Sequence, residues 1–143
     1  MDNKIQKELS SNGILRAAIN MSNFLLVTDK TKDGTPIGVS PDMAKELANK
    51  LNLQLKLIPY DTPGEIADSA ENNEWDICNI GAEPQRAEKI NFSAAYAEIQ
   101  ATYLIQPNSK LQNISDVDKI GNKIAVASRT AYGLWLERNI HNA

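Results

Sequence analysis

The sequence predicts an α/β fold built around a mainly parallel sheet. Segments with strand character alternate with segments of helical spacing along the 143 residues, and this alternation is typical of βαβ units joined by right-handed crossovers. A hydrophobic share of 42% provides enough apolar residues for a core in a chain of this length. No internal repeat or low-complexity segment indicates a different architecture.

The chain is expected to begin with a short amphipathic helix followed by a buried strand. Apolar residues recur at helical spacing within residues 1–12, and an Asn-Gly pair then supplies a helix stop. The apolar run "ILRAAIN", residues 14–20, predicts a buried strand. Residues 21–38 are expected to form a long connection that turns at Asp33-Gly34.

The segment "SPDMAKELANKLNL", residues 40–53, predicts the clearest helix of the chain. Ser40 is expected to be its N-cap and Pro41 to occupy its first helical position. Apolar residues recur every three or four positions and define the face that we expect to pack as plain core. These residues are Met43, Ala44, Leu47, Ala48 and Leu51.

The remaining segments continue the alternation of strands and helices. Apolar runs and alternating patterns predict the strands, and helical spacing with Ser, Thr or Pro at the start predicts the helices. Strands are expected over residues 53–60, 75–81, 98–107 and 123–128, and helices over residues 62–74, 84–90 and 130–143.

Polar residues lie at the ends of three predicted strands, and ligands in parallel sheets bind outside the carboxyl ends of the strands. Asn20 and Asn23 follow the first strand, and residues 79–86 follow the strand that begins at Trp75. Thr130 follows the last strand, where its side chain is expected to cap a helix. The alternative is that this helix start also offers N–H groups to a ligand.

Arg86 is the most informative residue at these strand ends. Pro84 suits the first position of a helix, which places a cation in a first turn where the helix dipole is positive. One interpretation is a surface arginine paired with Glu83 or Glu88. The other is an anion site, in which Gly81 permits close backbone approach and the guanidinium binds a carboxylate or phosphate.

Several classes of function are disfavoured by composition and motifs. The net charge of −3 and the pI near 5.2 argue against nucleic-acid binding. Neither a phosphate-binding P-loop nor a dinucleotide-binding glycine motif occurs. Cys78 and His141 lie far apart, so no metal site or catalytic cysteine is expected, and Cys78 is interpreted as a packed thiol. The first residues lack the apolar core of a signal peptide, and no apolar run is long enough to span a membrane.

Four stretches carry a resemblance to a known family. They are "GILRAAIN", "PIGVSPDMAKELANKLNLQLKLIPYD", "WDICNIGAEPQRAEKINFSAAYAEIQATYLI" and "KIAVASRTAYGLWLERN". In this order and spacing, they resemble the family 3 solute-binding proteins, the periplasmic-type amino-acid receptors of ABC transporters. The resemblance runs from Gly13 to the end of the chain. It implies a periplasmic-binding-protein type II-like fold, in which two lobes with mainly parallel sheets close on a small ligand.

The resemblance also implies which residues bind the ligand. Arg86 matches the arginine that holds the ligand's α-carboxylate, and the loop before it contributes backbone and side-chain contacts. The matching turn of the second lobe has Arg129 at a position where the family has Gly. The family has an aromatic residue at the position of Asn23, and here the aromatic residue is the adjacent Phe24. The complete set of implied ligand-binding residues is Asn20, Asn23, Asn79, Ile80, Gly81, Ala82, Arg86, Ser128, Arg129 and Thr130. No catalytic residue, metal or cofactor is implied.

The resemblance predicts how the chain divides into domains. Residues 1–12 are expected to be a lead-in, residues 13–95 the N-terminal part of lobe 1, residues 96–106 a crossing strand at the hinge, and residues 107–143 an incomplete lobe 2. Family members continue beyond this point, so the chain resembles their N-terminal part. An incomplete lobe leaves strand edges unpaired, and self-association or domain swapping is an expected consequence.

The leading function is therefore binding of an amino acid or related carboxylate for uptake by an ABC-transporter permease. The resemblance implies a periplasmic location, and a cytoplasmic one stays open because the sequence shows no signal peptide. One alternative is an enzyme on the same fold, similar to the cyclohexadienyl dehydratases, with Glu83 as the candidate general acid. Another is a truncated fragment that binds no ligand.

Overall fold

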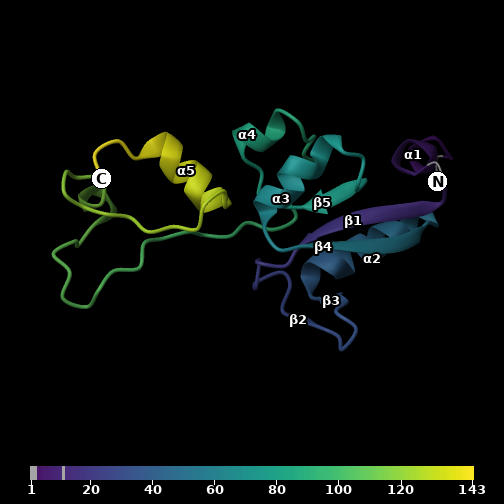
Figure 1. Cartoon of the computed structure of the whole chain (residues 1–143), viewed down its shortest axis with the longest axis horizontal. Coiled ribbons are helices and arrows are strands. Elements are labelled where there is room, and N and C mark those ends of the chain that lie inside the picture. The colour runs from purple at the N-terminus through teal and green to yellow at the C-terminus, as the bar shows by residue number, and fades with distance from the viewer. Residues whose placement is uncertain (1–2, 11) are drawn as a thin grey trace. The chain divides into compact units, whose positions relative to one another are not determined.

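The computed structural model describes residues 3–10 and 12–143. It divides into two compact units, Met1–Ile90 and Asn91–Ala143 (Figure 1). This division does not by itself test the predicted lobe and hinge boundaries, which stay predictions.

The first unit contains the predicted parallel sheet. Strand β1 (Ile14–Asn20) lies between β4 (Gln54–Tyr60) and β5 (Ile77–Asn79), and it pairs in parallel with both. The bounds of β1 are those that its apolar run predicts. A central strand has neighbours on both edges, which agrees with the burial of the last four residues of β1. The α/β prediction with a parallel sheet is confirmed.

Helices cover both faces of this sheet. Figure 1 shows α2 (Val39–Leu51) on one side and α3 (Pro63–Asp68) on the other. Ala17 and Ile19 of β1 pack with Ala44 of α2, and Ile66 of α3 is fully buried. Strand alternation explains this arrangement, because successive residues of β1 point to opposite faces of the sheet.

The start and the buried face of α2 differ from the prediction. The N-cap is Gly38, and Ser40 lies inside the helix, where it is buried and its backbone N–H donates to the Leu26 carbonyl at 2.9 Å. Met43 is 42% exposed, so its assignment to the core face is wrong. Small side chains allow closer approach of helix and sheet, and the packed face is rotated accordingly. It consists of Ser40, Pro41, Ala44, Ala48 and Leu51.

The connection after β1 contains a hairpin that sequence periodicity did not reveal. Strands β2 (Asp29–Lys30) and β3 (Pro36–Ile37) pair antiparallel around the predicted turn. Gly34 in that turn has a φ of 88°, which favours glycine. Two-residue strands carry too little alternation to be recognised from sequence.

The other elements of the first unit are shorter than predicted. Helix α4 spans only Pro84–Ala87. Helix α1 spans Asn3–Leu9, and the predicted start of this helix lies outside the described residues. Helix α3 begins with a capping box between Thr62 and Glu65, and it continues into a 3-10 turn at Ser69–Glu71.

The second unit lacks the strands that the sequence predicts. Residues 98–107 and 123–128 are irregular, and the described residues after Asn79 contain no strand. These predictions are wrong for this chain, because an apolar alternating segment forms a strand only when a neighbour accepts its hydrogen bonds. The unit contains a 3-10 turn at Ile114–Asp116 and helix α5 (Ala131–Asn139).

An ion pair between Asp76, just before β5, and Arg16 of β1 links the two strands. Arg16 Nη2 lies 2.6 Å from Asp76 Oδ1, and the Arg16 side chain and backbone both donate to Oδ2, with Nε at 3.1 Å and the backbone N at 2.8 Å. Burial alone would raise the pKa of Asp76, but the hydrogen bonds and charge of Arg16 outweigh it and hold the pKa below its ordinary value.

This ion pair makes stability sensitive to acid. Because the folded pKa of Asp76 is depressed, its contribution is present above the ordinary carboxyl pKa and is lost as pH falls through the folded pKa. Asp76→Asn should lower the free energy of unfolding by about 1–3 kcal/mol at pH 7 and by less at pH 3. Urea denaturation at the two pH values measures this difference. Exposed Glu46→Gln is the control, and an equal loss from Asp76→Asn at both pH values would contradict the prediction.

Candidate functional site

The carboxyl ends of β1 and β5 form the candidate site. We call this region the carboxyl edge: Asn20, Asn79 and the loops that follow them. The two strands are direct neighbours, with Ile19 opposite Asn79. The chain crosses from β4 on one side of β1 to β5 on the other, so the strand order reverses here, which is where open α/β sheets bind ligands. The predicted Asn20 and Asn79 are therefore brought together by the sheet.

Asn20 is a buried polar residue at this edge. Only 8% of the residue is exposed to solvent. Its Oδ1 accepts hydrogen bonds from the Ser22 backbone N–H at 3.1 Å and from the Ser22 hydroxyl at 2.7 Å. These two bonds orient the amide and hold the loop that follows β1.

Asn79 joins β5 to α2. Its Nδ2 donates to the Ser40 carbonyl and to the Ser40 hydroxyl, each at 3.0 Å. Ser40 therefore belongs to the edge by structure, although the sequence assigned it to a helix cap. A Ser-Pro pair signals a helix start, and no local signal marks its contact with a strand 39 residues away.

Arg86 is buried, with 4% of the residue exposed. Its Nη1 donates to the Gly81 carbonyl at 2.8 Å, so the guanidinium spans the loop that leads from β5 into α4. The interpretation of Arg86 as a surface side chain is therefore wrong. Pro84 begins α4 as predicted, and Glu83 is its N-cap residue.

The charge of Arg86 affects the pKa of the Cys78 thiol. Burial raises the pKa of the Cys78 thiol to about 12, and the positive charge of Arg86 opposes this shift without reversing it. A thiol with this pKa is protonated at neutral pH, and a thiolate nucleophile requires the opposite shift. The structure supports the interpretation of Cys78 as a packed thiol.

The other predicted residues of the first unit lie in the two loops of the edge. Ile80 is half-buried, whereas Gly81 and Ala82 are exposed. Asn23 is half-buried, and its Oδ1 accepts from the Leu25 backbone N–H at 3.3 Å. The neighbouring Phe24 is 78% exposed, which leaves its ring available for contact with a ligand.

The three predicted residues of the second unit surround the start of α5. Thr130 is the N-cap as predicted: its hydroxyl accepts from the Gly133 N–H at 3.1 Å and donates to the Ala127 carbonyl at 2.8 Å. Arg129 has a φ of 60°, in the region that favours glycine. Ser128 is exposed.

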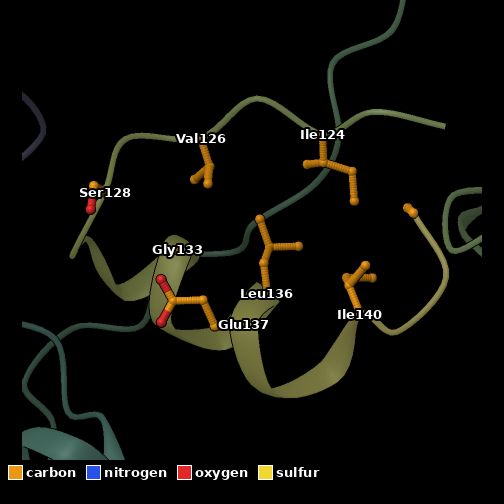
Figure 2. Close-up of a pocket in the computed structure, with 8 residues that line it drawn as sticks. Ile124, Val126, Ser128, Gly133, Leu136, Glu137 and Ile140 are labelled. Atoms are coloured by element: carbon orange, nitrogen blue, oxygen red, sulfur yellow. The ribbon is translucent and has the colours of Figure 1, made fainter.

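Ser128 also lines a pocket inside the second unit. The pocket has a volume of about 380 Å³ and lies between the extended segment before α5 and one face of that helix (Figure 2). Its lining is mostly apolar and includes no cationic side chain, so it does not suit a carboxylate. The lining residues are Ile124, Val126, Ser128, Gly133, Leu136, Glu137, Ile140 and Ala143.

Neither a metal cluster nor a membrane-spanning helix occurs in the described part of the chain. Residues 3–10 and 12–143 contain no group of three or more His, Cys, Asp or Glu side chains suited to a metal ion. Over the same residues, no helix has the length and apolar character needed to cross a membrane.

Comparison with known families gives one match. The model of the bacterial extracellular solute-binding proteins, family 3, matches residues 15–132. No curated protein matches the sequence.

Several solved structures share the fold. An ancestral amino-acid-binding protein, described as a precursor of cyclohexadienyl dehydratase, is 24% identical with a TM-score of 0.75, over 95% of this chain and 61% of its own. A putative ABC-transporter binding component from Wolinella succinogenes, complexed with lysine, is 21% identical with a TM-score of 0.68, over 92% of this chain and 57% of its own. An ancestral cyclohexadienyl dehydratase is 23% identical with a TM-score of 0.56, over 64% of this chain and 38% of its own. The chain thus spans less than two thirds of the length of each of these proteins, and at these identities the likeness is one of fold.

Proposed function

Because this chain belongs to the bacterial extracellular solute-binding proteins, family 3, we propose that it binds an amino acid or a related small carboxylate. The observation that carries this proposal is Arg86, a buried cation beyond the end of β5 in the region where parallel sheets bind ligands. The planar guanidinium matches a carboxylate in shape and charge. Its bond to the Gly81 carbonyl holds that charge in place before a ligand arrives.

The other residues of the proposed site act around this cation. Asn20 and Asn23 contribute from the loop after β1, and residues 79–82 contribute from the loop after β5. Ser128, Arg129 and Thr130 are proposed as ligand-binding residues from family membership alone. Delivery of the ligand to an ABC-transporter permease and a periplasmic location are proposed from family membership.

We propose binding without catalysis, and the support for this is the membership of the chain in a family of solute-binding proteins. The ancestral cyclohexadienyl dehydratase shares the fold at 23% identity. Glu83, the candidate acid for such chemistry, caps α4 through its backbone carbonyl, which accepts from the N–H groups of Arg86 and Ala87, and its side chain makes no cap hydrogen bond. Family membership supports binding, and we propose no catalytic step for this residue.

Replacement of Arg86 tests the proposal. Arg86→Ala should weaken binding of the carboxylate ligand by about 2–5 kcal/mol, which is at least about thirtyfold in affinity. Arg86→Lys should restore only part of this loss, because an ammonium lacks the planar fork. A thermal-shift screen of amino acids and dicarboxylates identifies the ligand, and calorimetry then measures the affinities.

A nearby surface cation provides the control for this experiment. Lys89 pairs with Glu71 and is exposed, so Lys89→Ala should change affinity and stability by no more than about 0.5 kcal/mol. Because Arg86 is buried and bonded to Gly81, Arg86→Ala should also destabilise the unliganded protein by about 1–3 kcal/mol. Loss of stability with unchanged affinity would show that Arg86 is purely structural.

A further inference from the structure

Residues 98–106 are an irregular segment of the second unit whose backbone is largely unpaired. Within the described ranges, 3–10 and 12–143, no backbone-to-backbone hydrogen bond involves residues 98–105. The segment ends at a turn, in which the Ser109 N–H donates to the Gln106 carbonyl at 2.9 Å. A row of unpaired N–H and C=O groups is what an edge strand offers to another chain.

The side chains of this segment have the composition of a strand, yet many of them are exposed. Leu104 is fully exposed, and Ile99 and Ile105 are each more than 40% exposed. The run "IQATYLIQ" between Glu98 and Pro107 contains no charged residue and no proline or glycine. Uncharged segments of this length that are rich in strand-forming residues pair readily with a second strand.

The alternation of the segment gives it one apolar face when it is extended. This face consists of Ile99, Ala101, Tyr103 and Ile105. Tyr103 and Ile105 line a small cavity of about 140 Å³ together with apolar side chains from residues 111–117 of the same unit. A two-stranded ribbon is only marginally stable by itself, and residues 111–117 provide a layer on which its apolar face can pack.

We propose that residues 98–106 pair antiparallel with the same segment of a second copy of this chain, around a two-fold axis at Thr102. Such an interface uses the same surface on both copies, so it closes a dimer. Residues that lie opposite each other in an antiparallel pair point to the same face of the ribbon. With Thr102 at the centre, Ile99 of one copy lies opposite Ile105 of the other, and the apolar faces of the two strands coincide.

Charges favour this segment over the other strand-like segment of the second unit. In the proposed register, Glu98 lies opposite the neutral Gln106, and no like charges face each other. The equivalent two-fold pairing of residues 123–129 would place Lys123 opposite Arg129 of the second copy. Like charges directly opposite each other destabilise a strand pair, so residues 98–106 are the self-complementary segment.

The size of the segment predicts a weak dimer. Residues 98–106 are fewer than the roughly 20–30 residues per partner of a standard interface. The dissociation constant is therefore expected between about 1 μM and 1 mM. Sedimentation velocity on the complete chain tests this, because the average mass should rise toward that of a dimer as concentration increases. A protein that stays monomeric at millimolar concentration would overturn the proposal.

Charged variants at the two-fold axis give the sharpest test, because Thr102 there faces its own copy. Thr102 is exposed, so a charge at this position should leave the fold of the monomer intact. Thr102→Glu and Thr102→Lys each place like charges opposite each other and should weaken association by about fivefold or more. In an equimolar mixture of the two variants opposite charges meet, and the mixture should associate more tightly than either variant alone.

Matched control variants lie in the other strand-like segment. Ala125 is exposed between residues 123 and 129, and Ala125→Glu and Ala125→Lys make the same changes of charge. These variants should keep the dissociation constant within about twofold of the original, because solvent screens a charge that is not opposite its own copy. An equal loss of association at Ala125, or a mixture of the Thr102 variants that associates no more tightly than its components, would overturn the proposed pairing.

Discussion

Replacement of Gly38 by alanine is expected to destabilise the first unit by about 2–5 kcal/mol. Gly38 is the N-cap of α2, with φ 140° and ψ −173°, a region that residues with a side chain rarely adopt. An added Cβ would lie 2.5 Å from the Leu26 carbonyl oxygen and 3.0 Å from the Thr28 backbone nitrogen. Both are backbone atoms, so the clash can be relieved only by moving the loop that packs against the helix start.

Gly34→Ala separates the two causes of this loss. Gly34 also has a positive φ, 88°, but nothing lies within 4 Å of the position that an added Cβ would take. This substitution should therefore cost only the backbone strain, about 1–2 kcal/mol. Urea denaturation of both variants gives the comparison. Equal losses would show that strain alone accounts for Gly38, and a neutral Gly38→Ala would contradict the close approach of Leu26.

Replacement of Ile66 by alanine should lower the free energy of unfolding by about 2–5 kcal/mol, because it removes buried methylenes and leaves a cavity. Ile66 is fully buried on α3, the helix that covers the second face of the sheet. The same substitution at Ile37, which is 43% exposed in β3, should cost no more than about 1 kcal/mol. Chemical denaturation monitored by circular dichroism ranks the two. The reverse order would mean that α3 does not form the second core layer.

Much of the first unit follows from local sequence. The apolar run of residues 14–20 defines β1, and Pro84 begins α4. In the second unit, Thr130 caps α5 for the same reason, because each of these features depends on a few adjacent residues. The positions of Asn20 and Asn79 beside each other also follow, because neighbouring parallel strands end at one edge.

Predictions from local patterns fail where the packing or hydrogen-bonding partner of a residue is distant in sequence. The spacing of Met43 is helical, yet the packed face of α2 is set by how closely the helix approaches the sheet. The runs at 98–107 and 123–128 have strand character, yet described residues near them provide no strand for pairing. Arg86 in a first turn suggests a surface cation, yet Arg86 is buried and its guanidinium donates to the Gly81 carbonyl.

The sequence by itself determined the α/β class, the order of the main elements in the first unit and the edge at which polar residues gather. These depend on periodicity, turn residues and helix starts, which act over a few residues. Only the tertiary structure decided that Arg86 is buried and that Ser40 binds Asn79. The burial of a residue and its hydrogen-bond partners depend on which distant segments of the chain pack together. Local sequence patterns do not specify these long-range contacts.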